Sequence, residues 1–179
     1  MSGMLLPKVT VILRGYETEQ VLCVVEQLVG TKVNSIEVAS NSPHAMQSIA
    51  AARKEFGAEV RVGAGTVTNL DLAKQAVDAG AEFMLSPVMF TKEMFDFAKK
   101  NEVITVPAAF SPSEIKMMFD MGADIVKCSR RGSWVPIMSS CAGGPWEASA
   151  YGCGWRRNGQ RPELFRQGRH IRWYRFGHF

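Results

Sequence analysis

A strand-then-helix unit repeats along residues 1–127 of the 179-residue chain. Short apolar runs rich in β-branched residues, typical of strands buried on both faces, alternate with segments of helical character. The strands are expected at residues 9–15, 33–39, 60–67, 83–87, 103–107 and 123–127. The helices are expected at residues 17–29, 42–56, 69–79, 91–100 and 111–121. This alternation predicts an α/β fold with a parallel sheet, which either a doubly wound sheet or a barrel would satisfy.

Several helix ends carry capping residues. Pro43 follows Ser42 and is expected at the first turn of the second helix, where a missing N–H costs least. Asn69 is expected to cap the third helix, and Ser111 with Glu114 has the spacing of a capping box. These signals place the helix boundaries independently of the apolar pattern.

The pattern stops after residue 127. Residues 1–127 carry 12 Lys and Arg against 15 Asp and Glu, whereas residues 128–179 carry nine Arg, no Lys and two acidic residues. All four tryptophans lie in this second part, at Trp134, Trp146, Trp155 and Trp173. Residues 128–179 show neither helical spacing nor clean alternation, so we expect an irregular Arg-, Trp- and Gly-rich tail after the α/β part.

The length of the chain and its residue types limit which classes of protein it can belong to. The chain is shorter than the roughly 250 residues of a complete barrel of eight strands and eight helices. No apolar run approaches the ~20 residues of a membrane helix, and the first residues lack the features of a secretion signal, so we expect a cytoplasmic protein with no membrane partner. The chain has three histidines, and they are not spaced like metal ligands, so we expect no bound metal. They are His44, His170 and His178. Free thiols are expected at Cys23, Cys128, Cys141 and Cys153.

Reactive side chains fall where the predicted strands end. In parallel α/β proteins the carboxyl ends of the strands carry the functional groups. A lysine at the end of a buried strand has its ammonium form disfavoured by desolvation, which leaves neutral amine for attack on a carbonyl group, and a nearby carboxylate can move protons. The candidates at these ends are Arg14, Glu37, Thr66, Ser86, Pro107 and Lys127.

Each candidate also has an ordinary structural explanation. A strand-terminal lysine such as Lys127 often extends its amine to solvent, and a lone strand glutamate such as Glu37 is often an ion-pair partner. Arg14 could serve in a structural ion pair, and Gly63 with Gly65 could mark only a tight bend or a close approach of backbones. The joint occurrence at one end of successive strands favours carbonyl chemistry through a lysine Schiff base.

Six motifs then resemble one enzyme family. VILRG, IEVASNSP, VGAGTV, FMLSP, VPAAFSPSE and GADIVK occur in the order and spacing of the 2-keto-3-deoxy-6-phosphogluconate and 4-hydroxy-2-oxoglutarate aldolases, from about Lys8 to Lys127. The resemblance implies a (β/α)8 TIM barrel, here truncated to about six β-α units with an irregular C-terminal tail. It also implies a homotrimer that needs no metal or other cofactor and binds a small keto acid or phospho sugar acid.

The resemblance assigns roles to individual residues. Lys127 matches the lysine that forms the imine, and Glu37 matches the general acid and base. Thr66 matches the threonine that helps to hold the pyruvyl carboxylate, and Arg14 matches an arginine that contacts substrate in phosphogalactonate-type relatives. Ser86 and Pro107 are expected to line the substrate site. The implied reaction is reversible cleavage of a 2-keto-3-deoxy-6-phospho sugar acid to pyruvate and an aldehyde.

The chain departs from the family at three places. Asn41 stands where gluconate-type enzymes usually carry arginine, which leaves the preferred substrate stereochemistry open, and Ala108 stands where glycine is common. After Lys127 the family continues with a hydrophobic residue and FPA, but this chain continues from Cys128 to Arg131 as CSRR.

An alternative reading frame accounts for the third departure. Codons that encode residues 127–140 can, one frame over, encode VFPAGVLGPDYVK, the family's continuation after the lysine. Codons for residues 140–179 can encode the seventh and eighth strands of the family, including its AVGGV and GIGSG turns. We therefore interpret residues 128–179 as an out-of-frame segment, and expect that strands one and six have open edges and that the chain folds poorly.

Two other functions fit part of the sequence. One is a different phosphate-handling barrel enzyme, an isomerase or a decarboxylase, which would form no imine. The other is a nucleic-acid-binding module, because arginines interleave with aromatic residues near residues 168–179. The frame interpretation explains that composition without a nucleic-acid partner, so we expect none.

Overall fold

Helices and parallel strands alternate along the first 128 residues in the computed structural model, which describes residues 6–7, 9–128, 146–148, 154–157 and 172–176. The strands of this part are β1 (Val9–Leu13), β2 (Ser35–Ala39), β3 (Arg61–Gly65), β4 (Phe83–Leu85), β5 (Ile104–Val106), β6 (Ala108–Ala109) and β7 (Val126–Cys128). The helices are α1 (Thr18–Leu28), α2 (Ala45–Phe56), α3 (Leu70–Asp78), α4 (Lys92–Lys100) and α5 (Pro112–Asp120). The predicted α/β order is confirmed.

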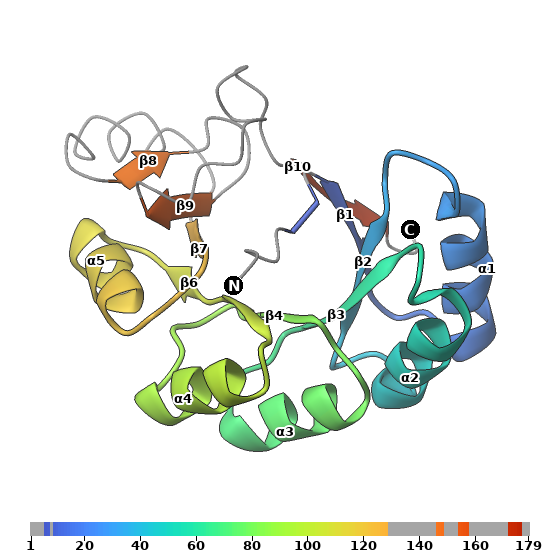
Figure 1. The fold of residues 1–179 in the computed structure, drawn as a ribbon, viewed down its shortest axis with the longest axis horizontal. Coiled ribbons are helices and arrows are strands. Elements are labelled where there is room, and N and C mark those ends of the chain that lie inside the picture. Colours follow the sequence, from blue (N-terminus) through green and yellow to red (C-terminus); the bar gives the residue numbers. More distant parts are fainter. Residues whose placement is uncertain (1–5, 8, 129–145, 149–153, 158–171, 177–179) are drawn as a thin grey trace.

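The strands form a curved row with the helices on its outer side (Figure 1). Neighbours from β1 to β5 pair in parallel and in sequence order, and β6 pairs in parallel with β7. Pro107 separates β5 from β6, and the Lys127 N–H donates to the Pro107 carbonyl (2.8 Å), so β7 continues the same row. Over the described residues the row is that of a barrel fold that does not close.

Two caps agree with the sequence and one helix start does not. The Asn69 side chain accepts from the Leu72 N–H, and Ser111 with Glu114 forms a capping box. The second helix begins at Ala45 rather than at Pro43. Its start shifts because the Ser42 hydroxyl accepts a hydrogen bond from the Gly15 N–H (2.9 Å) and its own N–H bonds to the Ala39 carbonyl, which holds this segment in a turn.

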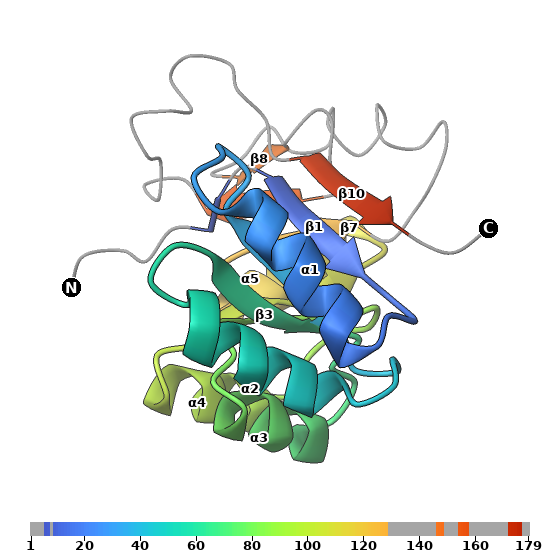
Figure 2. The same ribbon diagram turned by 90° about the vertical axis from the view of Figure 1, so that its right-hand side faces the viewer.

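The tail contains three strands where we expected none. They are β8 (Trp146–Ala148), β9 (Gly154–Arg157) and β10 (Arg172–Phe176). The expectation of open edges is wrong for both strands: β10 lies parallel to β1 (Figure 2), and β9 pairs with β7 in the antiparallel sense. The rest of the predicted irregular tail lies outside the described residues.

The two faces of the strand row are buried in different ways. Strand positions that point outward, such as Val11, Ile36 and Val62, pack against the helices in the larger apolar cluster. A smaller cluster fills the inner side with residues from β4, β5 and the segment before β7, and it includes one residue from near the N-terminus. Its members are Leu6, Phe83, Leu85, Ile104, Val106 and Ile125.

Two findings bear on the class of protein. Cys23 is a free, exposed thiol, while the side chains of the other three cysteines lie outside the described part of the chain. Among the described helices, none has the length and apolar character needed to cross a membrane.

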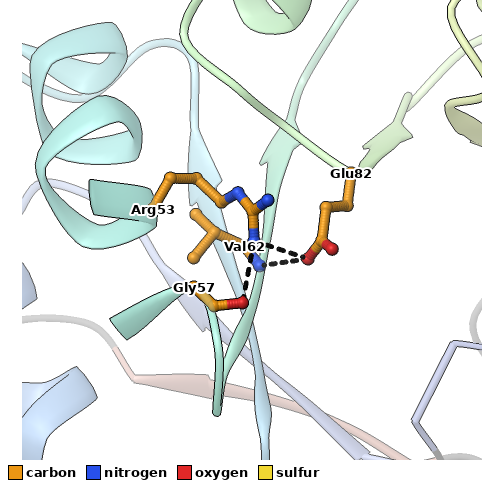
Figure 3. A network of polar contacts seen from close by, with 4 residues as sticks. All are labelled: Arg53, Gly57, Val62 and Glu82. Carbon is orange, nitrogen blue, oxygen red and sulfur yellow. Dashed lines mark hydrogen bonds and ion pairs between the residues drawn. The ribbon is translucent and has the colours of Figure 1, made fainter. Parts of the chain in front are cut away.

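A polar clamp ties α2 to β3 and β4 (Figure 3). Arg53 Nη1 lies 3.3 Å from Glu82 Oε2 and donates to the Gly57 carbonyl (3.1 Å). The same carboxylate oxygen accepts from the Val62 N–H at 3.3 Å. Glu82, from the turn before β4, therefore contacts both the last turn of α2 and the backbone of β3, and its side chain is only partly exposed.

We expect Glu82→Ala to lower the free energy of unfolding by about 1–2 kcal/mol, because a strand N–H and a guanidinium lose their acceptor. Urea denaturation measures the loss. Asp96→Ala is the matched control, since its ion pair with Lys92 joins two exposed side chains one helical turn apart and should contribute at most about 0.5 kcal/mol. Equal losses in the two variants would contradict the clamp.

Candidate active site

Strand register places Glu37 on the inner face of the strand row. Val11, Ile36 and Val62 are register partners and face the helices. Because side chains alternate along a strand, the next position along each strand faces inward. Glu37 occupies that position on β2, opposite Ile12 of β1 and Gly63 of β3.

The same alternation directs Arg14 and Lys127 inward. Arg14 follows Ile12 by two residues, just beyond the end of β1. Lys127 follows Ile125 by two residues, and Ile125 belongs to the inner cluster. Lys127 is half-buried. The interior thus receives one ionisable side chain each from the middle of β2, from β7 and from the residue just after β1.

Glu37 is a buried carboxyl group with a perturbed proton affinity. Its side chain is 4% exposed, and burial raises its pKa from 4.5 to about 7. The positive charges of Lys127 and, to a smaller extent, Arg14 lower the pKa and only partly offset the burial. Within the described part of the chain, Glu37 Oε2 has no hydrogen-bond partner. The carboxyl group therefore changes its charge near neutral pH and retains a free acceptor.

Two glycines on β3 leave the space that the neighbouring side chains fill. A methyl group at Gly65 would overlap the carboxyl group of Glu37, which reaches across from β2. A methyl group at Gly63 would overlap the ring of Phe83, which reaches across from β4. The inner face of β3 is thus covered by a carboxyl group on one side and an aromatic ring on the other.

Arg14 is held at the rim by two hydrogen bonds. Its Nη1 donates to Asn41 Oδ1 (2.7 Å), and its Nη2 donates to Thr66 Oγ1 (3.0 Å). Thr66 has a φ of 59°, an uncommon conformation for a residue with a branched side chain, at the point where β3 ends. The turn presents the Thr66 hydroxyl to the guanidinium. Asn41, from the exposed turn after β2, completes the cluster.

Ser86 and Pro107 form hydrogen bonds with backbone groups. The buried Ser86 hydroxyl accepts from the Val88 N–H (3.0 Å), and the Pro107 carbonyl accepts from Lys127. Their expected place in the substrate site stays a prediction. Sequence reasoning did not select Ser40, whose hydroxyl donates to the Gly65 carbonyl (2.6 Å) and ties the end of β2 to that of β3. Its place one residue after the β2 strand was the available signal.

An amine, a carboxyl group that titrates near neutral pH and an arginine share this interior. Comparison with known proteins identifies the family that has this arrangement of elements. The model of the KDPG and KHG aldolase family matches residues 2–147, more than half of the chain. The chain belongs to the KDPG and KHG aldolase family.

Curated relatives carry the same family name over the same part of the chain. A 2-dehydro-3-deoxy-phosphogluconate aldolase from Zymomonas mobilis is 32% identical over 104 residues, which cover 58% of this chain and 49% of the relative. An aldolase of the same name from Treponema pallidum is 35% identical over 95 residues, covering 53% of this chain and 44% of the relative. The chain spans about half the length of the curated relatives that it matches.

Solved structures agree on the fold. A KDPG aldolase from Legionella pneumophila, with pyruvate captured as a covalent carbinolamine, aligns with a TM-score of 0.59 and 29% identity over 66% of this chain and 56% of that chain. A structure described as native KDPGal aligns with a TM-score of 0.64 over 76% of this chain and 68% of that chain, and at 21% identity it shows the fold alone. The aldolase-type TIM-barrel fold predicted from the sequence is confirmed.

The raised pKa of Glu37 predicts a pH dependence of stability. Between about pH 4.5 and pH 7 the folded protein keeps a proton that the unfolded chain releases, so stability falls as pH rises through this window. The Glu37→Gln variant does not titrate in this window. Relative to that variant, the free energy of unfolding of the parent chain should fall by roughly 3 kcal/mol across the window. Urea unfolding of both proteins at several pH values measures the difference. A constant difference would show that Glu37 ionises normally.

Proposed function

We propose that this protein is a class I aldolase that cleaves 2-keto-3-deoxy-6-phospho sugar acids of the gluconate or galactonate type, 4-hydroxy-2-oxoglutarate, or both, to pyruvate and an aldehyde. The observation that carries the proposal is that Lys127 shares the inner face with a buried Glu37, whose pKa is raised to about 7 and is lowered in part by the charge of Lys127. A carboxyl group with such a pKa can both accept and donate a proton near neutral pH.

The proposed reaction begins at Lys127. Its neutral amine adds to the C2 carbonyl, and loss of water from the carbinolamine gives a protonated imine. Glu37 as carboxylate takes the proton of the C4 hydroxyl while the C3–C4 bond breaks, and the bonding electrons move into the imine to form an enamine. The aldehyde leaves, Glu37 returns its proton to C3, and water releases pyruvate and the lysine. The iminium acts as the electron sink of the transition state.

Substrate binding is assigned to the rim of the same interior. Arg14 supplies a positive charge for an anionic group of the substrate, and Asn41 fixes its orientation. Thr66 holds the pyruvyl carboxylate together with backbone N–H groups, and Ser86 and Pro107 shape the wall between β4 and β7. Assembly as a homotrimer in the cytoplasm completes the proposal. Because Asn41 replaces the usual arginine of gluconate-type enzymes, the galactonate-type substrate is as well supported as the gluconate type.

Imine formation separates this proposal from another phosphate-handling barrel enzyme. We expect that pyruvate with borohydride adds one reduced pyruvyl group to Lys127, detected by peptide mass spectrometry. Lys127→Arg should remain unmodified because its guanidinium does not form the imine. An unmodified Lys127 in the folded parent chain would refute the aldolase function.

We also propose that residues 128–179 are an out-of-frame form of the family's last two β-α units. The parallel pairing of β10 with β1 supports it, because the last strand of a closed (β/α)8 barrel lies parallel to the first. A chain with that frame restored should cleave the phosphorylated substrate at least about 100-fold faster, since the loops after the last strands form the phosphate site of this fold. The two chains should form the pyruvyl imine equally. Equal cleavage rates would reject the frame proposal and leave the aldolase proposal intact.

A further inference from the structure

Gly65 has no side chain, and this leaves space in the active site. It lies at the last position of β3, opposite Ala39 of β2 in the register, and is buried. Its backbone conformation does not require glycine, because Gly65 is not among the residues with a positive φ. The need for glycine at this position therefore comes from what occupies the space above it.

The Glu37 carboxyl group occupies that space. A methyl carbon at position 65 would overlap both the carboxyl carbon and Oε1 of Glu37, and would stand 2.8 Å from its Cγ. Rotation of the carboxyl group alone does not relieve a contact with Cγ, so the side chain would have to adopt a different rotamer. Its surroundings are buried, and a new rotamer would carry the carboxyl group away from its present place beside β3.

We propose that Gly65 is the positioning residue for Glu37: the absence of a side chain there lets the carboxyl group cross β3 and face the interior shared with Lys127. This inference rests on the proposed aldolase function. It differs from the close backbone approach that a glycine in a strand usually indicates, because the group that approaches is the side chain from the neighbouring strand. Gly63 has the same relation to Phe83, a packing residue of the inner cluster.

With pyruvate as the only substrate, Lys127 and Glu37 can be tested separately. Lys127 forms the imine, whereas removal of a methyl proton from that imine needs the Glu37 carboxylate. In deuterium oxide this step replaces the C3 protons of pyruvate by deuterium, which proton NMR follows. Borohydride trapping in the same sample reports the imine. One sample therefore gives a readout of each residue.

We expect Gly65→Ala to keep the borohydride adduct on Lys127 and to lose deuterium exchange by at least about 100-fold, the usual contribution of a general base. The rise of the exchange rate around pH 7 that we expect for the parent chain should disappear. Adding Gly65→Ala to Glu37→Gln should slow exchange no further, because both changes remove the same group. Gly30→Ala is the control for general destabilisation: its φ of 74° makes any side chain there unfavourable, but nothing lies within 4 Å of the new carbon, so it should leave the adduct and the exchange unchanged.

Stability supplies a second test that does not depend on activity. Gly65→Ala should destabilise the parent chain through overpacking but should cost little in Glu37→Ala, where the space above position 65 is empty. Parent-like exchange in Gly65→Ala, loss of its adduct together with exchange, or an equal stability cost in both backgrounds would each overturn the positioning role. Absence of the adduct in the parent chain would instead refute the aldolase function itself.

Discussion

The burial of one carboxyl group constrains the rest of this site. Glu37 lies in the middle of a strand whose five residues are all buried, and nothing among the described residues donates to its Oε2. An isolated carboxylate in such a place is unfavourable, so the group keeps its proton until near neutral pH. Two cations, Lys127 on β7 and Arg14 just after β1, reduce this penalty without cancelling it, because the pKa stays well above its ordinary value.

Much of the fold follows from local sequence signals. The strands are short apolar runs, and the caps at Asn69 and Ser111 use contacts within four residues, so both are predictable from a single sequence. The start of α2 was not, since the hydroxyl of Ser42 bonds to the backbone of Gly15, 27 residues away. The pairing of β10 with β1 likewise joins distant segments, and the composition of residues 172–176 gives no sign of it.

The ionisable residues of the site were predictable for a related reason. In a parallel sheet the strand ends gather at one edge, so Arg14 and Lys127 could be placed together without knowing any distance. The contact of Glu37 with Gly65 could not be placed in that way, because it depends on the direction in which a side chain crosses the neighbouring strand. Thr66 was selected as a strand-end residue, but its contact with Arg14 was not predictable, since it depends on the φ of 59° in the turn after β3.

Coupling between the lysine and the carboxyl group gives the proposed cycle a direction for proton transfer. A positive charge on the Lys127 nitrogen lowers the pKa of Glu37, so loss of that charge makes the carboxyl group hold its proton more strongly. The nitrogen is neutral as it attacks the carbonyl group. It is charged again in the iminium, when a carboxylate is needed to take the hydroxyl proton. The charge that activates the substrate therefore also prepares the base that completes the cleavage.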